Sequence, residues 1–366
     1  MPNTIEILPS SDSRSLSKKQ PVLPNYEAAD RQFVDLLEVE DLDKTVATKP
    51  LLVSDFESAI AVALRSAYQE PNGSEAAHSF LQRVLYRINR LNLFWYDDLR
   101  RYNNERSHYL RSVRDRIEEP WQQWESAQID VAALQKLPDV KQALRDRAAA
   151  DVARPLNETD RYLREQMTAA GYRHLLAIGS IDGLVEASHL SRILGGVGNE
   201  IQSTLTRVLI EEYGGGRLPR KHSTFFAQML AEFDMSTQPE AYFDLVPWEV
   251  LATINHNFLL TDRKRHFLRY NGGLTYFEVA GPVTYRNYVA GVQRLGLSEA
   301  AMSYWELHVR EDERHGRWML DEVAIPLVDR YPQDAWELVL GYDQAQSMGD
   351  RAGAAVVRSI QAAERN

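Results

Sequence analysis

Apolar residues recur every three or four positions along most of the chain from Asp55 onward, which is the period of an amphipathic α-helix. Ser54 and Asp55 are suited to cap a helix through Ala67, and Ser74 is suited to cap another that continues to about Leu91. Alternating segments typical of strands are nearly absent, and no Asn-Gly hairpin signal lies between β-branched runs. The pattern predicts an all-α fold.

Two glycine clusters interrupt the helical pattern in the second half of the chain. Gly-Gly-Val-Gly at 195–198 is expected to turn the chain from one helix into the next, and Asn-Gly-Gly at 271–273 is expected to link two helical stretches. Upstream, Trp121 and Trp124 lie three apart in a long polar helix, where core packing is the expected role of both rings.

The domain organisation follows from shifts in composition along the chain. Residues 1–50 carry Ser, Pro and Lys with weak periodicity, which indicates a mostly flexible arm with one short helix near Arg31 to Leu37. A charged, Ala-rich segment that ends at Pro155 marks the next boundary. The chain is therefore predicted to contain an N-terminal helical region over 51–155 and a core over 156–366.

The composition limits the chemistry that the core can hold. The chain has 366 residues and no cysteine, which excludes disulfides, thiolate metal sites and iron–sulfur clusters. A transition metal would need His, Asp and Glu ligands, which suit iron or manganese and less often zinc. The net charge of −10, without a sustained Lys/Arg stripe, argues against nucleic acid as a partner. Because neither a long apolar run nor a signal segment is present, we expect no membrane span and a cytoplasmic location.

The strongest chemical signal lies in one helix predicted over Tyr304 to Leu320. His308, Asp312 and His315 occupy positions i, i+4 and i+7, so their side chains lie within about 60° of one another. Met319 continues that face, so two imidazoles and a carboxylate point where apolar residues belong. Burying them unpaired costs on the order of several kcal/mol, which a bound metal ion removes. A polar patch or an interhelical salt bridge is the alternative.

A second candidate carboxylate ends another predicted helix. Ile201, Leu205 and Val208 share one face of this helix, and Glu212 lands on that same apolar face. Glu211 falls off the face. Glu212 is therefore the better metal ligand of the two.

Three further residues complete the set of candidates. Past Gly214–Gly216 and Pro219 the chain reaches His222, and spacing alone does not show whether this imidazole turns inward. Glu186 lies in apolar company, where a carboxylate is either a ligand or the partner of a buried base. Glu278, in TYFEVAGP, is another carboxylate beside an apolar stretch and carries a weak signal by itself.

In combination these motifs resemble the haem-oxygenase-like diiron oxidases, which are also known as iron-containing redox enzymes. The shared features are the His-x3-Asp-x2-His helix, a Glu-Tyr-Gly-Gly turn that runs to a His, and a glutamate one helix earlier. The resemblance covers roughly Arg161 to Arg358, and GVQRLGLSEAAMSYWELHVREDERHG is its most telling part. It implies a haem-oxygenase-like seven-helix bundle, here with an N-terminal helical extension. It also implies two irons per chain and no haem.

The resemblance implies a metal-ligand set that departs from the family at one position. Many members have an acidic ligand three residues before the His of the second ligand helix, and here that position is Pro219. Either Glu278 replaces this carboxylate or the second iron site is weak. The positions that match are Glu186 on the first ligand helix, Glu212 and His222 on the second, Glu278 ahead of the last, and His308, Asp312 and His315 on the third.

The implied activity is oxidation of a small molecule by Fe(II) and dioxygen. The family carries out N-oxygenation of amines, or fragmentation and desaturation of amino and fatty acids, and no residue here selects among these outcomes. The expected partners are the substrate, dioxygen and an electron donor, and a homodimer stays open as the assembly. Arg286, with Tyr285 and Tyr288 nearby, is a candidate to bind a carboxylate-bearing substrate.

Three other interpretations remain open. A ferritin-like diiron bundle needs two Glu-x2-His motifs on separate helices, and a metal-independent enzyme on the haem-oxygenase fold needs none. A non-catalytic helical binding protein would use its acidic surface for partners. The Glu-x2-His spacings present are Glu75/His78, Glu105/His108 and Glu186/His189.

Overall fold

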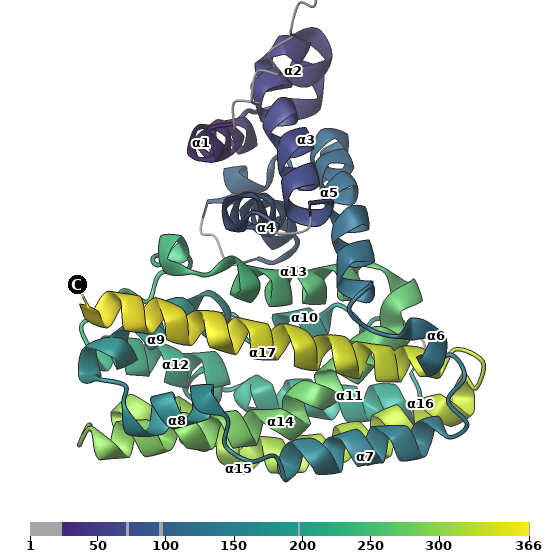
Figure 1. The fold of residues 1–366 in the computed structure, drawn as a ribbon, viewed down its shortest axis with the longest axis vertical. Helices are drawn as coiled ribbons and strands as arrows, with labels where there is room; N and C mark the ends of the chain where they lie inside the picture. Colours follow the sequence, from purple (N-terminus) through teal and green to yellow (C-terminus); the bar gives the residue numbers. More distant parts are fainter. Residues whose placement is uncertain (1–23, 71–72, 95–97, 197, 366) are drawn as a thin grey trace, which may run out of the picture.

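The computed structural model describes residues 24–70, 73–94, 98–196 and 198–365 of the chain. Every regular element in these ranges is a helix, so the predicted all-α fold is confirmed. The helices form two tiers, in which a smaller N-terminal tier stands on a larger bundle (Figure 1). Residues 1–23 of the predicted arm lie outside the described residues.

The N-terminal tier begins within the segment that the sequence predicts as an arm. Residues 26–48 form two helices, because Ala29, Phe33 and Leu36 recur at helical spacing and are buried. The Phe33 ring stacks on Phe56 with centroids 4.9 Å apart. Ser74 caps its helix as predicted, since its hydroxyl accepts a hydrogen bond from a backbone N–H. The tier consists of α1 (Tyr26–Leu37), α2 (Leu42–Thr48), α3 (Ser54–Tyr68), α4 (Glu75–Asn89) and α5 (His108–Ser126).

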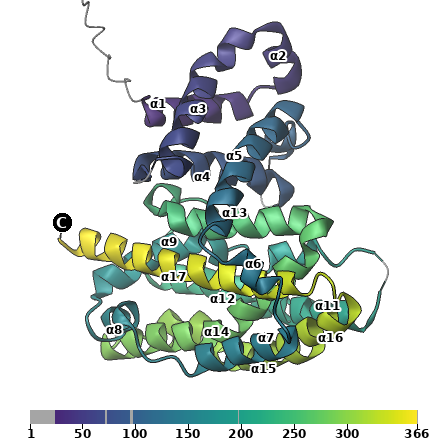
Figure 2. The ribbon, with the colours of Figure 1, turned by 45° about the vertical axis from the view of Figure 1, so that its right-hand side comes forward.

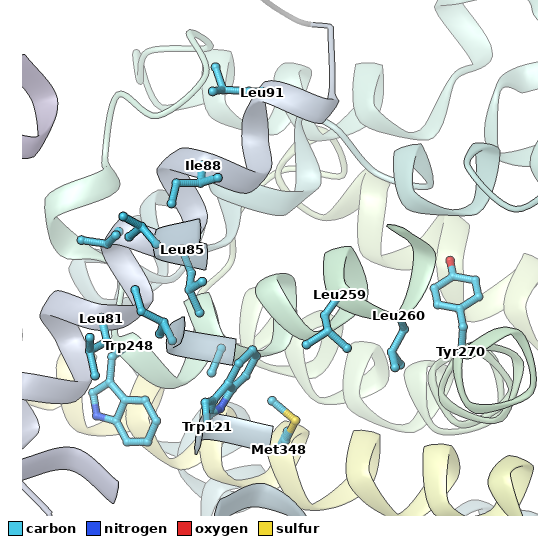
Figure 3. Close-up of a cluster of buried hydrophobic side chains, with 14 of the residues drawn as sticks. Leu81, Leu85, Ile88, Leu91, Trp121, Trp248, Leu259, Leu260, Tyr270 and Met348 are labelled. Carbon is cyan, nitrogen blue, oxygen red and sulfur yellow. The ribbon is translucent and has the colours of Figure 1, made fainter. Parts of the chain in front are cut away.

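An apolar interface joins the two tiers. Helix α4 packs on α13 (Trp248–Asp262), which in turn packs on α17 (Trp336–Arg365). Both views show α13 between the upper tier and α17 (Figure 2). Trp121 at the lower end of α5 is fully buried, which confirms its predicted core role. Figure 3 shows its ring beside Met348, and both residues belong to a cluster of buried hydrophobic side chains that also includes Trp248. Its indole N–H donates to Glu125, which also pairs with Arg351 of α17.

The lower bundle is built around the long helix α14, which packs against α15, α17, α8 and α7. Helix α7 lies inside the predicted region 51–155 but belongs to this bundle, because its contacts are with α14, α16 and α17. The bundle consists of α6 (Val131–Leu134), α7 (Val140–Val152), α8 (Glu158–Glu165), α9 (Ala169–Gly183), α10 (Ser188–Ser191), α11 (Glu200–Glu212), α12 (His222–Glu232), α13 (Trp248–Asp262), α14 (Phe267–Arg294), α15 (Ser303–Arg317), a π-helical stretch over Trp318–Ala324, α16 (Ile325–Arg330) and α17 (Trp336–Arg365).

The Asn-Gly-Gly sequence at 271–273 is not a link between helices, contrary to the sequence prediction. It lies inside α14, where Gly272 meets the backbone of α17 so closely that a Cβ would stand 1.9 Å from the Leu338 carbonyl oxygen. Gly341 does the same on α17 against the carbonyl oxygen of Arg269. These glycines are there for close helix packing, which outweighs their low helix propensity.

None of the helices in the described ranges combines the length and the apolar character that a membrane span requires.

We predict that Gly272→Ala destabilises the bundle, because its Cβ cannot avoid the α17 backbone. The free energy of unfolding should fall by about 1–3 kcal/mol or more, as for other overpacking changes. Gly353→Ala is the matched control on α17, since its Cβ meets its nearest neighbour, Thr159, at an ordinary 3.9 Å. The control should leave stability unchanged or raise it by up to about 1 kcal/mol. Denaturant unfolding of both variants is the measurement, and equal stabilities would contradict the packing argument.

Candidate metal centre

Helix α15 brings three of the predicted residues to one buried face. His308, Asp312 and His315 lie on it as their spacing predicts, and each is no more than 4% exposed. Gly316 sits beside them against α14, where a Cβ would stand 2.9 Å from the Glu278 carbonyl oxygen. The two helices can therefore approach closely at this point, which places the Glu278 side chain beside His315.

The question that spacing leaves open for His222 is answered by the turn before it. Glu212 is the last residue of α11 and is buried. Gly214 to Gly216 then adopt positive φ angles of 60°, 62° and 76°, which favour glycine, and the chain reverses into α12. His222 is the first residue of α12 and turns inward, with its Nδ1 2.8 Å from Glu212 Oε2. Pro219 lies exposed in the turn, away from the cluster.

Glu186 reaches the same place from a turn rather than from a helix. The predicted helix over 181–193 is interrupted, because α9 ends at Gly183 and α10 begins at Ser188. Ala187 has a φ of 60°, a left-handed conformation that costs a non-glycine residue about 1–3 kcal/mol. The Glu186 Oε1 accepts a 2.6 Å hydrogen bond from the Tyr304 hydroxyl and lies 3.0 Å from His308 Nε2.

The predicted residues form two adjoining groups of ligand atoms. In each group, one nitrogen or oxygen from every member lies within 4.8 Å of the others. Glu212 belongs to both groups, with Oε2 facing His222 and Oε1 facing His315 at 3.3 Å. Asp312 borders the second group, with Oδ1 3.9 Å from His315 Nδ1. The first group is Glu186, Glu212, His222 and His308, and the second is Glu212, Glu278 and His315.

Hydrogen-bond partners outside the cluster orient two of the imidazoles. His308 Nδ1 lies 2.8 Å from the Tyr304 carbonyl oxygen, so in the neutral ring Nδ1 keeps the proton and the Nε2 lone pair faces Glu186. His315 Nε2 lies 2.8 Å from Glu211 Oε2, so its Nδ1 lone pair faces Glu212, Glu278 and Asp312. Acceptor atoms therefore converge on two points. Such an arrangement, in which an outer carboxylate or carbonyl fixes the ring, is typical of metal-binding histidines.

Several buried polar atoms of the cluster have no hydrogen-bond partner in the protein, which indicates that a ligand is missing. Glu186 Oε2, Asp312 Oδ1 and His315 Nδ1 are buried and have no hydrogen bond. Leaving such groups unsatisfied costs about 1–3 kcal/mol each, and more where the group is charged. A cation bound between the two groups would take up these lone pairs. The oxygen and imidazole donors present suit iron or manganese.

The enclosed charges shift the pKa values of the cluster. Burial acts to lower the pKa of His315, but its contacts with Glu212 and Glu278 raise it to about 11. Burial also acts to lower the pKa of His308, but the charges of Glu186 and Asp312 outweigh this effect, so the pKa of His308 stands well above its usual value. Burial raises the pKa of Asp312. Without a metal ion, protonated imidazoles therefore offset the negative charge of the carboxylates in the cluster.

Two cavities reach the cluster from different sides. One, of about 150 Å³, is lined by residues of α9, α10, α13, α14 and α15, including Asp182, His189 and Tyr285. The other, of about 590 Å³, lies between α7, α14 and α15 and reaches Glu278 and Asp312. Its lining is largely apolar, with arginines at the rim. Both cavities give small molecules access to the carboxylates of the second group.

Several residues of the site escape sequence reasoning. Glu211 falls off the apolar face of α11, yet it lies behind His315 and also pairs with Arg314 at 2.6 Å. Tyr304 shares the face of His308, but its bond to Glu186 depends on how α15 meets the α9–α10 turn. Only the packing of separate elements reveals these contacts, so no local signal in the sequence identifies them.

The ferritin-like pairs are dispersed in the structure. His78 stacks on Trp248 with centroids 4.3 Å apart, and His189 packs edge-on against Phe258 at 4.3 Å. His108 is exposed at the start of α5. Among the described residues, Glu186 is the one member of these pairs that lies in the groups of ligand atoms.

We predict different effects for two neighbouring glutamates on divalent-cation binding. Glu212→Gln removes a shared carboxylate and should abolish binding in both groups. Glu211→Gln should retain binding but weaken the His315 group by about 10–100-fold, as for other residues that orient a ligand. Anaerobic titration with Co(II), followed by its visible absorption, measures both variants. If Glu211→Gln binds Co(II) as the unaltered chain does, Glu211 has no orienting role.

Comparison with known proteins agrees with this geometry. Over 150 residues the chain is 28% identical to a nitrosourea synthase of Streptomyces achromogenes subsp. streptozoticus. The alignment covers 41% of this chain and 32% of that protein, so the match spans about a third of the relative's length. Residues 173–350, just under half of the chain, match the profile of the family described as iron-containing redox enzymes. This segment, which is similar to the iron-containing redox enzyme family, contains every residue of the two groups.

Proposed function

We propose that this chain binds two Fe(II) ions at the adjoining groups and uses dioxygen to oxidise a small molecule. The observation that carries the proposal is the pair of donor sets that share Glu212. Two sets this close require a carboxylate between them, because two bare divalent ions in one buried volume would repel each other strongly.

The charges and donors support two ions rather than one. Glu186, Glu212, Glu278 and Asp312 supply four negative charges, which balance two divalent cations without a further anion. His222 and His308 would hold the first ion with Glu186 and Glu212. His315 would hold the second with the remaining carboxylates. Glu278 would thereby provide the acidic ligand that the family places at the position of Pro219.

When bound, the iron pair supplies electrons to dioxygen and makes it reactive toward the substrate. Insertion of one oxygen atom into a substrate leaves the other to form water, which consumes two protons and two electrons from an external donor. The protein holds the ligand side chains in position. Tyr304 fixes Glu186 by donating its hydroxyl proton, Glu211 fixes the ring of His315, and burial of the cluster keeps bulk water away.

The type of oxidation is proposed from the relative. The name nitrosourea synthase describes formation of a product with an oxidised nitrogen, and this chain is similar to that protein over 150 residues. We therefore favour oxygenation of a substrate nitrogen over oxidation of a fatty acid.

The experiment is an anaerobic Fe(II) titration followed by exposure to oxygen. The unaltered chain should bind two irons by elemental analysis and then consume dioxygen, with transient visible absorption. His308→Ala, Asp312→Ala and His315→Ala should each lose at least one iron. Glu165→Gln, an exposed change on α8, is the control and should bind two. Unchanged iron content in all three ligand variants would falsify the proposal, as would an unaltered chain that binds no iron.

The raised histidine pKa values predict that iron binding is pH-dependent. Since the pKa of His315 is raised to about 11, its imidazole is protonated at neutral pH in the metal-free chain, whereas a ligand imidazole must be neutral. Fe(II) binding should therefore release protons, and Fe(II) affinity should increase as the pH rises from about 6 to about 9. Anaerobic calorimetry in two buffers of different ionisation enthalpy counts the released protons. A pH-independent affinity would show that the imidazoles are already neutral.

A further inference from the structure

A series of aromatic rings in contact runs from the metal centre to the surface of the bundle. It begins at Tyr304 and Tyr285, whose ring centroids lie 4.2 Å and 5.2 Å from that of His308. Both rings contact Trp305 of α15, with centroids 4.9 Å and 5.5 Å apart. Trp305 in turn lies 4.8 Å from Tyr288 of α14. These separations are those of interacting aromatic pairs.

Trp305 is the ring at which the series converges, and its position is fixed. It is 5% exposed, and its indole N–H donates a 2.8 Å hydrogen bond to the Tyr172 hydroxyl. Tyr172 is fully buried and donates in turn to the Ala301 carbonyl oxygen, so the indole N–H has a partner that is itself held in place. The indole also stacks on Tyr285 with an interplanar angle of 24°.

The two ends of the series differ in their surroundings. Tyr304 is buried and its hydroxyl donates to Glu186, so the inner end touches the first group of ligand atoms. Tyr288 is half-buried, so the outer end reaches solvent. Phenylalanine would fill such a core equally well, as Phe226 does beside Trp305. Tyrosine and tryptophan differ from it chemically, because they are the side chains that lose a single electron most readily in a chain without cysteine.

The electron balance of dioxygen gives such a series a use. Reduction of dioxygen to two water molecules takes four electrons and four protons, and two ferrous ions supply two of the electrons. A substrate that is oxidised at the centre supplies the other two. When no substrate is bound, the two missing electrons come from the protein, and the centre must limit this competing reaction.

We propose that Trp305 and Tyr288 carry electrons to the metal centre when dioxygen reacts there without a substrate, and so protect the cluster from oxidation. Trp305 gives one electron to the oxidised centre across Tyr304 or Tyr285 and becomes a radical cation that keeps its N–H proton. Tyr288 then gives one electron to Trp305, releases its hydroxyl proton to solvent and is left as a neutral radical. The inference rests on the proposed function.

A soluble thiol completes the cycle by giving one hydrogen atom to the Tyr288 radical. Two passages along the series supply the two missing electrons, and two thiols are oxidised to one disulfide. Dioxygen, two ferrous ions, two thiols and two protons thereby become two water molecules, two ferric ions and the disulfide.

Trp318 represents a competing route. Its half-buried ring lies 5.6 Å from that of His315, so it would lead from the second group of ligand atoms to the surface in one step. The guanidinium groups of Arg207 and Arg314 lie 3.7 Å and 5.2 Å from its centroid. Two positive charges this close oppose the formation of a cation on the ring, so we favour Trp305.

The test exposes the Fe(II)-loaded chain to dioxygen without substrate or thiol and follows organic radicals by freeze-quench electron paramagnetic resonance. Ring-deuterated tryptophan distinguishes the two kinds of radical. The unaltered chain should give a tyrosyl signal, and Tyr288→Phe should give a tryptophan signal in its place. Trp305→Phe should lose the tyrosyl signal and, by peptide mass spectrometry, show more oxidation of the residues around His308. Trp305→Tyr should retain a radical, because its ring is oxidisable, whereas a packing defect would affect both variants alike.

Iron content separates this inference from the proposed function. Every variant should bind two irons, because none of these residues is a ligand, and Trp124→Phe in the N-terminal tier is the control that should leave the signal unchanged. A chain that binds two irons and consumes dioxygen without an organic radical overturns the inference and leaves the proposed function standing. A signal that persists in Trp305→Phe, or that only Trp318→Phe removes, overturns it as well. A chain that binds no iron overturns the proposed function and this inference together.

Discussion

The structure depends on a set of mutually repelling carboxylates held together inside a helical bundle. Glu186, Glu212, Glu278 and Asp312 meet in a volume from which solvent is largely removed, so their repulsion is only weakly screened. The bundle tolerates this because packing elsewhere fixes the helices. The close contacts of α14 with α17 at Gly272 and with α15 at Gly316 set the positions from which these side chains extend. The repulsion is offset by protons on the histidines or by bound cations, and the raised pKa of His315 reflects the first of these.

The part of the site that lies on one regular helix could be predicted from the sequence. His308, Asp312 and His315 share a face because helical periodicity fixes their relative directions within a few residues. The same rule separates Glu212 from Glu211. The all-α fold follows in the same way, since helical spacing covers most of the chain. These are local properties, and local rules describe them well.

The remainder depends on turns and on the packing of distant elements. The direction of His222 follows from three glycines with positive φ, which sequence spacing cannot convert into a direction. Glu186 lies in a turn after α9 and not within the helix that its apolar neighbours suggest. The Asn-Gly-Gly sequence at 271–273 has the composition of a turn, but the need of α14 to approach α17 decides its conformation.

The position of Glu212 between the two groups has a thermodynamic consequence. Its Oε2 faces one group and its Oε1 the other, so a cation bound on one side would fix the carboxylate rotamer that the other side requires. Two cations bound as proposed would therefore be linked through one side chain, and their coupling free energy would be the same in both directions. The second ion would cost less conformational entropy than the first, while electrostatic repulsion between the ions would act in the opposite sense. The balance of these two effects decides whether partly loaded molecules accumulate or whether the centre fills as a pair.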